Sequence, residues 1–204
     1  MPEAATGRVP HLLGASMMRV PRKQFKVPPF SRKRVGTLAP EDAPRSRVAS
    51  FGNARVVDMR DAREDAIRLW TDGSCYPNPG PAGVGVLYED GPYLLELAEF
   101  MPTATNNVAE LTAVLRALEL VVDRNAPVDV YCDSEYVIGT VALMWSASTN
   151  TELVAELRHV WLYEVRDARF VKVPGHTGVP GNERADALAG WARKERKTLI
   201  WRND

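Results

Sequence analysis

Hydrophobic and polar residues alternate with regular spacing through the later part of the chain, and the spacing changes from segment to segment. In residues 106–122, Val108, Leu111, Leu115 and Leu118 recur every three or four positions, which places them on one face of a helix. Shorter apolar runs, bounded by glycine, proline and asparagine, lie before and after this segment. Runs of that kind are typical of strands.

These patterns predict an ordered region from about residue 66 onward. Strands are expected at 66–73, 83–89, 93–101, 127–132 and 168–173. Helices are expected at 106–122, 134–145, 151–164 and 180–197. The Asp90-Gly91 dipeptide predicts a tight hairpin between the second and third strands. Strands and helices in this order predict an α/β domain with a sheet of mixed direction, long enough to bury a core of its own.

The first part of the chain differs in kind. The whole chain has a formal net charge of zero, yet residues 1–50 carry ten Lys or Arg against three Asp or Glu. We expect residues 1–65 to form a basic, proline-rich and mostly disordered arm, and residues 198–204 to form a short tail. Such an arm either holds a polyanion loosely or acts as a solubility tail. Its start also resembles an organelle transit peptide, and translation from Met59 would leave it unmade.

Composition argues against membrane and secreted classes. No apolar run approaches the roughly 20 residues that span a bilayer, and no signal-peptide pattern stands near the start. Cys75 and Cys132 are the two cysteines, and they offer neither a zinc spacing nor a disulfide framework. This usage suits a reducing compartment. We therefore expect a cytoplasmic protein with no membrane partner, and a monomer by default.

Four carboxylates stand at element ends or on helix flanks, and each has an ordinary explanation. Asp72 could begin a turn. Glu110 stands three residues after Asn107, which is the spacing of a capping box. Asp133 ends a strand just before a helix, where aspartate is a good N-cap. Asp186 could lie on the solvated face of the last helix.

Taken together, the same acids suggest a cation site. If the strands that end at Asp72 and Asp133 are adjacent and parallel, both acids emerge at one edge of the sheet, where α/β proteins usually bind ligands. Helices that carry Glu110 and Asp186 could pack over that edge. Crowded carboxylates raise one another's pKa unless a cation lies between them, and hard oxygen ligands favour Mg²⁺ or Mn²⁺ over zinc. Periodicity alone leaves the strand arrangement open.

Four segments of the chain closely resemble those of type 1 ribonuclease H, and the similarity spans about residues 67–193. In chain order they read TDGSCYPNPGPAGVGV, TATNNVAEL, VYCDSEYV and KVPGHTGVPGNERADALA. The resemblance implies a ribonuclease H-like α/β fold, whose five-stranded mixed sheet is flanked by helices and has its first and fourth strands adjacent and parallel. Residues 66–197 are then the catalytic domain. The implied reaction is hydrolysis of the RNA strand of an RNA–DNA hybrid, leaving 5′-phosphate and 3′-hydroxyl ends.

The resemblance also implies roles for the acids and for one histidine. Asp72, Glu110, Asp133 and Asp186 match the metal-binding acids of the family. Asp72 would bridge two Mg²⁺ ions in the substrate complex, Glu110 and Asp133 would hold the ion on the leaving-group side, and Asp186 the ion that activates water, with Mn²⁺ as a possible substitute. His176, on a glycine-flanked loop, matches a flexible histidine that assists proton transfer and product departure. Without the motif, a histidine on such a loop is simply solvated.

Substrate contacts follow from the same match. Asn78, Asn106 and Asn107 would approach the minor groove of the hybrid, and Thr105 would contact a phosphate of the DNA strand. Glu110 would also accept a hydrogen bond from a 2′-hydroxyl, the group that marks RNA. Contacts of this kind select geometry rather than base order, so little sequence preference is expected. The ordinary alternative is that these asparagines and the threonine are turn and cap residues.

One segment departs from the family. Many members carry a basic, tryptophan-rich protrusion after the second helix, whereas residues 143–160 are short and nearly without positive charge. Trp145 could stack on a DNA sugar, but its helical spacing from Val141 favours a place in the core. The basic arm, with its cluster at residues 19–34, could compensate for the missing phosphate contacts.

Two other functions compete with the nuclease. One is a binding module that has kept the fold and lost catalysis, and the other is a related nuclease or recombinase with another substrate. The presence of all four acids and of His176 argues against decay of the site. Within the resemblance, the TNN run before Glu110 together with GHTG and NERAD in the last segment favours hybrids over other substrates.

Overall fold

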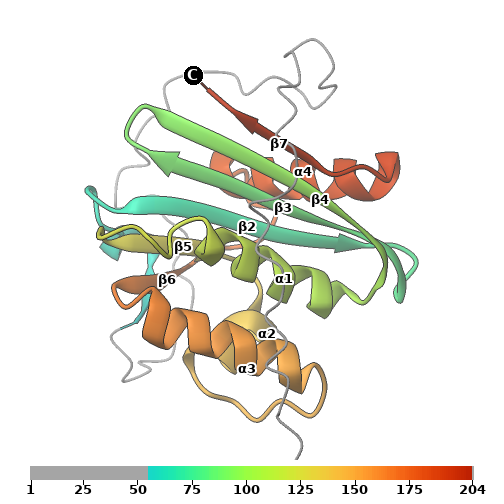
Figure 1. Ribbon diagram of the computed structural model, residues 1–204, viewed down its shortest axis with the longest axis horizontal. Coiled ribbons are helices and arrows are strands. Elements are labelled where there is room, and N and C mark those ends of the chain that lie inside the picture. Colours follow the sequence, from blue (N-terminus) through green and yellow to red (C-terminus); the bar gives the residue numbers. More distant parts are fainter. Residues whose placement is uncertain (1–54, 204) are drawn as a thin grey trace, which may run out of the picture.

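A seven-stranded mixed sheet forms the centre of the molecule in the computed structural model, which describes residues 55–203 (Figure 1). The sheet order is β1-β6-β5-β2-β3-β4-β7. The strands are β1 (Val56–Asp58), β2 (Ile67–Cys75), β3 (Gly80–Asp90), β4 (Tyr93–Ala104), β5 (Val128–Cys132), β6 (Ala168–Lys172) and β7 (Leu199–Arg202). Most of the expected basic arm, including the cluster at 19–34, lies outside the described residues.

The predicted five-stranded sheet corresponds to β2–β6, and its α/β class and mixed direction are confirmed. The strand number of five is wrong, because β1 pairs in parallel with β6 and β7 pairs antiparallel with β4, one at each edge. These strands have three and four residues, too few for a hydrophobic period to emerge. The β2–β3 hairpin is also longer than expected, since Ser74 and Cys75 still pair with Gly83 and Ala82 across the glycine- and proline-rich segment.

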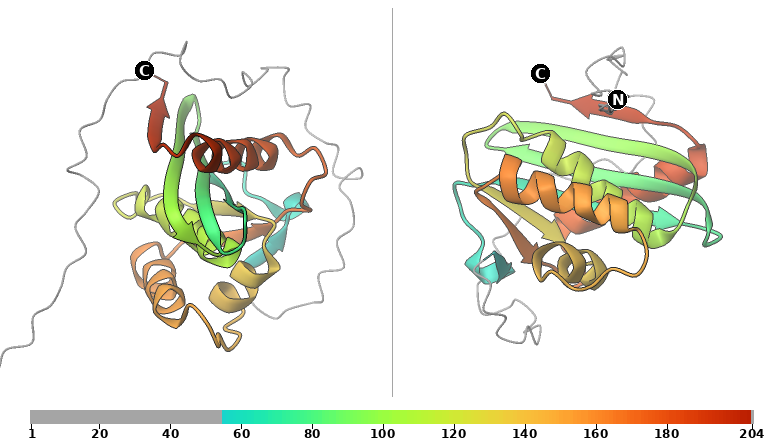
Figure 2. Two further views of the ribbon diagram at one scale, coloured as in Figure 1. Left: turned by 90° about the vertical axis from the view of Figure 1, so that its right-hand side faces the viewer. Right: turned by 60° about the horizontal axis from the view of Figure 1, so that its bottom comes forward.

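The helices cover both faces of the sheet. They are α1 (Asn106–Glu119), α2 (Glu135–Val137), α3 (Thr151–His159) and α4 (Pro180–Glu195), with a short 3₁₀ turn η3 (Met59–Asp61) and π-helical turns η4 (Ile138–Ala142) and η5 (Val160–Glu164) that continue α2 and α3. The helices α1, α2 and α3 lie on one side and α4 on the other (Figure 2). Within residues 55–203, no helix is both long and apolar enough to cross a bilayer.

The main core lies between the sheet and the layer of α1, α2 and α3. The predicted stripe of α1 is buried there at Leu111, Leu115 and Leu118. Trp161 and Phe170 meet edge to face in the same core, with ring centroids 5.5 Å apart. The first helix begins where the Thr105 hydroxyl accepts a hydrogen bond from the Val108 amide at 3.3 Å, so its apolar stripe faces the sheet from the first turn.

The last helix lies in backbone contact with the sheet. A Cβ atom added at Gly85 in β3 would stand 2.0 Å from the carbonyl oxygen of Ala185, so only glycine allows this approach. The buried guanidinium of Arg184 donates to both carboxylate oxygens of Glu96 in β4, at 2.8 and 2.6 Å. These contacts fix the position of α4 along the sheet, and therefore the position of Asp186.

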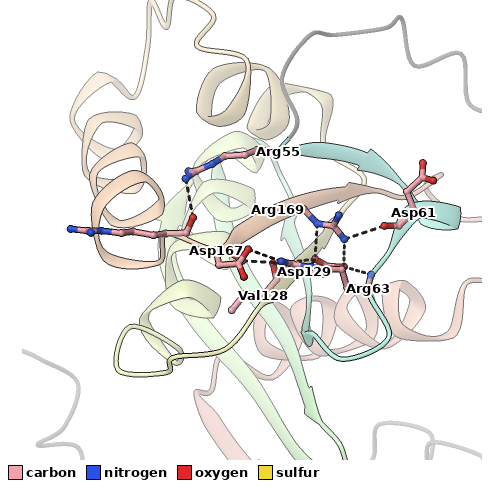
Figure 3. A network of polar contacts seen from close by, with 8 residues as sticks. Arg55, Asp61, Arg63, Val128, Asp129, Asp167 and Arg169 are labelled. Atoms are coloured by element: carbon pink, nitrogen blue, oxygen red, sulfur yellow. Dashed lines mark hydrogen bonds and ion pairs between the residues drawn. The ribbon is translucent and has the colours of Figure 1, made fainter.

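The residues just before β2 are fastened to the edge of the sheet by a polar network (Figure 3). At its centre is the Asp129 side chain in β5, which is fully shielded from solvent. Arg63 donates to Asp129 through its amide and Nε at 2.7 and 2.9 Å, and Arg169 donates through Nε and Nη2 at 3.2 and 3.1 Å. Arg169 also donates to the carbonyl oxygen of Asp61 at 3.0 Å. The network ties β1 and η3 to β5 and β6.

Candidate active site

Asp72 lies in β2 just beyond the point where its pairing with the parallel neighbour β5 stops, and Asp133 directly follows the last residue of β5. The β2–β5 pairing places Trp70 beside Tyr131, and two residues further along each strand are Asp72 and Asp133. The two acids therefore emerge at the same carboxyl edge of the sheet. This is the adjacency that a shared cation site requires.

Glu110 and Asp186 reach this edge from opposite layers. The first turns of α1 press against β2, since a Cβ atom added at Gly73 would lie 2.4 Å from the Glu110 amide nitrogen. Asp186 follows Ala185, whose carbonyl oxygen contacts Gly85, and Gly85 is the partner of Asp72 across the β2–β3 ladder. The sheet thus contributes Asp72 and Asp133, and the helices α1 and α4 on its two faces contribute Glu110 and Asp186.

The pKa of Asp72 reflects the presence of the other three acids. Burial raises the pKa of Asp72 to about 8, and the charge of Asp133 adds to the rise. A hydrogen bond from the Gly73 amide at 2.7 Å acts in the opposite direction. The charges of Asp186 and Glu110 raise the pKa further. All three other acids therefore act on Asp72, and the protonated form of Asp72 is strongly favoured.

Glu110 is held by two side-chain donors. Its carboxylate accepts a hydrogen bond from Asn106 Nδ2 at 2.7 Å and another from the Ser134 hydroxyl. Burial and the charge of Asp133 raise the pKa of Glu110 above its usual range, while these two hydrogen bonds lower it in part. The helix is capped by Thr105, so the capping-box alternative considered for Glu110 with Asn107 is wrong.

Asp133 likewise has no capping role. The N-cap of α2 is Ser134, whose hydroxyl accepts from the Val137 amide at 3.3 Å. Asp133 instead accepts a hydrogen bond from Asn182 Nδ2 at 3.0 Å. A Cβ atom added at Gly175 would lie 3.0 Å from Asp133 Oδ2. The loop between β6 and α4 therefore runs directly beside the acids.

The donor set fits a hard divalent cation. Within residues 55–203, no three Asp, Glu, His or Cys side chains already stand in a metal-ligating arrangement. The Asp72, Glu110 and Asp133 carboxylates accept hydrogen bonds from protein donors. Their charges nevertheless reinforce one another at Asp72, a repulsion that a cation would relieve. The buried Oδ1 of Asn182 also has no hydrogen-bond partner in the described part of the chain. Carboxylate and amide oxygens are the ligands that Mg²⁺ prefers.

His176 lies at the rim of this site. It is exposed on the loop between β6 and α4 and has a left-handed backbone conformation, with φ of 53°. The loop is shaped by a hydrogen bond from the Thr177 hydroxyl to the Pro174 carbonyl at 2.9 Å, and by one from the Gly178 amide to Glu183 at 3.2 Å. Since the neighbouring Gly175 abuts Asp133, the backbone of His176 lies close to this acid, and the residue is exposed to solvent.

The residues expected to contact substrate gather beside Glu110. Asn78 Oδ1 accepts a hydrogen bond from the Asn106 amide at 3.2 Å, which joins the loop after β2 to the start of α1. Asn106 in turn donates to Glu110, and Asn107 lies half-buried in the same first turn. Thr105 caps the helix, so its structural role is real whatever it contacts.

Trp145 is not a core residue. Its side chain is 49% exposed, and one face of the indole covers Gly139, where an added Cβ atom would lie 2.2 Å from the ring. The prediction of a core position is therefore wrong. The helical spacing from Val141 is broken because η4 ends at Ala142 and Met144 adopts a positive φ of 57°.

A family model for RNase H matches residues 64–194, well over half of the chain. The chain belongs to the RNase H family. Among curated relatives, the ribonuclease H of Polaromonas sp. is 42% identical over 136 residues, which cover 59% of this chain and 84% of the relative. The ribonuclease H of Methylorubrum extorquens is 38% identical over 139 residues, and this match spans 62% of this chain and 60% of the relative's length.

Solved RNase H structures have the same fold. RNase H1 from the archaeon Halobacterium salinarum is 30% identical with a TM-score of 0.56, and the match covers 64% of this chain and 98% of that one. LC11-RNase H1, solved in complex with an RNA/DNA hybrid, is 31% identical with a TM-score of 0.55 over similar shares of 64% and 98%. The chain is therefore a nuclease of the RNase H type, from a family that generally depends on divalent metal ions.

Two residues of the site in this RNase H chain carry no signal that the sequence interpretation used. Asn182 stands four residues before Asp186 on α4 and binds Asp133. Ser134 both caps α2 and binds Glu110. The one-turn spacing of Asn182 and Asp186 places them on a common helix face, and this would have been the signal for Asn182. Ser134 follows an acid directly and reads as an ordinary cap.

Proposed function

We propose that this chain is an endoribonuclease that hydrolyses the RNA strand of RNA–DNA hybrids at a site that holds two divalent metal ions. The observation that carries the proposal is the convergence of Glu110, Asp133 and Asp186 on Asp72, whose pKa they and burial raise to about 8. The RNA/DNA complex of LC11-RNase H1 supports the class of substrate.

The four acids are the residues that would hold the metal. Asp72 is the acid on which the charges of all three others act. When bound, a pair of Mg²⁺ ions supplies a nucleophile from water at neutral pH and stabilises the attacking and leaving oxygens of an in-line displacement. Cleavage on the 5′ side of a phosphate, with a 3′-hydroxyl leaving group, would give 5′-phosphate and 3′-hydroxyl ends. Mn²⁺ could replace Mg²⁺, because both prefer oxygen ligands.

The chain's own side chains position the substrate. Asn106 and Ser134 hold the Glu110 carboxylate in a fixed orientation, in which Glu110 can accept a hydrogen bond from a ribose 2′-hydroxyl. Asn78 is joined to Asn106, so the two can meet the minor groove together, with Asn107 and Thr105 next to them. These are contacts to sugar, phosphate and groove shape, which favour a hybrid without reading its sequence.

His176 would exchange protons at the rim. An imidazole titrates near neutral pH and can donate to a departing group or accept from water. Its exposed loop position leaves it free to move toward the phosphate that lies at the acids. Because it holds no metal, its loss should slow turnover less than the loss of Asp72.

A labelled-strand assay tests the proposal. The full chain is given RNA–DNA, RNA–RNA and DNA–DNA duplexes of one sequence, with the label on either strand, in Mg²⁺, in Mn²⁺ or in chelator. We expect cleavage of the RNA strand of the hybrid alone, abolished by chelator, with products that a 3′-hydroxyl-dependent polymerase extends. Tight hybrid binding without cleavage in either metal would contradict catalysis and indicate a binding module, and cleavage of another duplex would contradict the substrate.

A further inference from the structure

A second pair of polar side chains follows the acids along the same two elements. Ser74 comes two residues after Asp72 in β2, so both side chains lie on one side of the sheet. Arg193 comes seven residues after Asp186 in α4, close to two full helical turns, which returns it to the same helix face. Arg193 Nε donates to the Ser74 hydroxyl oxygen at 3.0 Å. The strand β2 and the helix α4 thus carry the acids Asp72 and Asp186, and further along each element they carry the pair Ser74 and Arg193.

The backbone holds this pair rigidly. Gly83 pairs with Ser74 across the β2–β3 ladder. A Cβ atom added at Gly83 would lie 2.1 Å from the carbonyl oxygen of Ala189 and 2.8 Å from the Arg193 amide nitrogen. Gly85, two residues away in β3, makes the same kind of close contact with α4. Arg193 is therefore placed relative to the acids as firmly as Asp186 is.

The guanidinium of Arg193 faces an exposed aromatic ring. Its central carbon lies 5.9 Å from the ring centroid of Tyr76, and Tyr76 is 75% exposed. In the part of the chain that the structure describes, no carboxylate forms an ion pair with Arg193, whereas Arg184 and Arg116 bind Glu96 and Glu99. Arg193 is thus a positioned cation that protein carboxylates leave available to an anionic ligand.

The segment where relatives carry a basic protrusion offers no such cation. Its arginine, Arg158, donates to the carbonyl oxygen of Thr140 at 2.8 Å and to that of Trp145 at 2.8 Å. These bonds hold the turn after η4 in place and leave Arg158 committed to the backbone. Phosphate contacts close to the acids must therefore come from another element, and the end of α4 continues with Lys194, Arg196 and Lys197.

We infer that Arg193, Ser74 and Tyr76 form a second contact site for the RNA strand, at a phosphate beyond the one that lies at the acids. The inference rests on the proposed function. Arg193 binds the phosphate, Ser74 orients the guanidinium, and Tyr76 packs against the adjacent sugar or base. Guanidinium groups are well suited to phosphate, and exposed aromatic rings stack on unpaired or sugar-edge surfaces of nucleic acids.

The spacing along β2 suits a second phosphate of the same nucleic-acid strand that lies at the acids. Two residues along a strand advance about 7 Å, which is about the axial rise of two base-pair steps at 3.4 Å each. A nucleic-acid strand that has a phosphate at Asp72 and continues along β2 would bring a further phosphate to Arg193. In the proposed function the strand at the acids is the RNA strand that is cut, so this phosphate would belong to RNA.

The test compares Arg193→Gln with Arg124→Gln, an exposed arginine after α1, at the opposite end of the sheet from the acids. KM and kcat for a hybrid are measured with the full chain at several salt concentrations. We expect Arg193→Gln to raise KM about tenfold and to reduce the slope of log KM against log salt by about one, as loss of one phosphate contact does, with kcat within about twofold. Arg124→Gln should leave KM and the slope as they are. A KM within about twofold of the parent for Arg193→Gln would overturn the inference.

Two further arms sharpen the result. Tyr76→Ala changes an exposed side chain and should raise KM several-fold, and no change in KM would overturn the role of the ring. Uncharged methylphosphonate linkages, placed one at a time in either strand, locate the phosphate. The inference is supported if a methylphosphonate at one position of the RNA strand weakens binding to the parent but does not weaken binding to Arg193→Gln any further. If the only position that behaves in this way lies in the DNA strand, the inference is overturned.

The outcome is separable from that of the proposed function. If the parent chain cleaves hybrids and Arg193→Gln behaves as the parent, the second contact site is wrong and the nuclease stands. If the parent chain does not cleave hybrids at all, the proposed function fails first.

Discussion

Asp72 lies within β2, just past the pairing of β2 with β5, and its carboxylate is largely shielded from water with three other carboxylates acting on it. Its pKa is raised to about 8 by burial, Asp133, Asp186 and Glu110. A protein that only needed a turn at this point would gain stability from a less crowded arrangement. The cost is understandable if a divalent cation joins the acids, because metal binding to the folded state alone adds stability by mass action.

The raised pKa makes a prediction for the metal-free protein. The folded state holds the Asp72 proton up to about pH 8, whereas the unfolded chain releases it near the ordinary value of 3.8. The contribution of Asp72 to the free energy of unfolding therefore becomes more unfavourable as pH rises through that window. In chelator, Asp72→Asn should be more stable than the parent at pH 8.5, on the order of 2 kcal/mol after allowance for partial solvent screening. Near pH 4 the difference should almost vanish.

Urea unfolding at the two pH values measures the effect. The control is Asp123→Asn, which changes an exposed aspartate after α1 and should show the same small difference at both. A stability difference for Asp72→Asn that does not change with pH would contradict the clustering of charge at Asp72.

Among single residues, the four acids were predictable from the segments that resemble the family, although only Asp133 directly follows the end of a strand and Asp72 and Asp186 lie inside their elements. Their partners were less so. Thr105 caps α1, two residues before the Asn107 that the capping-box spacing suggested, and Ser134 takes the cap expected of Asp133. Cap geometry depends on where the chain enters the helix, which neighbouring Ser, Thr, Asn and Asp residues specify almost equally well.

At the scale of elements, the segment between β1 and β2 is held to the sheet by a buried charge. Asp129 is a single acid within the otherwise apolar strand β5, and it is held by Arg63 and Arg169. Burial alone would raise its pKa, but the hydrogen bonds from Arg169 and Arg63 outweigh burial and lower the pKa of Asp129 below its ordinary value. The carboxylate is therefore charged at all ordinary pH values and needs both arginines.

Removing this charge should destabilise the fold without touching the site. Asp129→Asn leaves two arginines beside a neutral amide, and loss of one partner of a buried ion pair costs about 3–5 kcal/mol. Asp167→Asn is the matched control, since Asp167 also pairs with Arg63 but its side chain is 65% exposed, and exposed pairs contribute less than about 1 kcal/mol. Chemical unfolding measures both. Equal losses for the two variants would contradict the central place of Asp129.

The sequence could not reveal this element. Arg63 lies 66 positions from Asp129, and Arg169 lies 40 positions away. Periodicity reports on neighbours along the chain, so it identified the five longer strands and missed β1 and β7. Periodicity also ended the β2–β3 hairpin too early. Glycine and proline at 77–81 suggest a loop, yet β3 already begins at Gly80, which pairs with Ala104 in β4.

At the scale of the molecule, the order of strands decides the site. The sheet order places β5 beside β2 and so Asp133 beside Asp72, while α1 and α4 bring one acid each from opposite faces (Figure 1). No local pattern in the sequence determines which strands are neighbours. That arrangement came from the resemblance to RNase H, and the pairing of β2 with β5 agrees with it.

The surface that would receive the hybrid extends beyond the acids. Asn78, Asn106 and Thr105 lie on one side, and Arg193 with Tyr76 lies further along β2 and α4. The basic arm remains a predicted additional contact outside the described residues. The molecule thus combines a fixed acidic centre with polar and cationic contacts around it.

The most direct test of the central claim is the rate at which Asp72→Asn cleaves a labelled RNA–DNA hybrid in Mg²⁺, measured beside Asp123→Asn. If the acids hold the metal through Asp72, the Asp72→Asn rate should fall by more than the roughly 10- to 100-fold expected for an outer-shell partner, while hybrid binding persists and Asp123→Asn keeps the parent rate. An Asp72→Asn enzyme that cleaves within a few-fold of the parent would contradict the account.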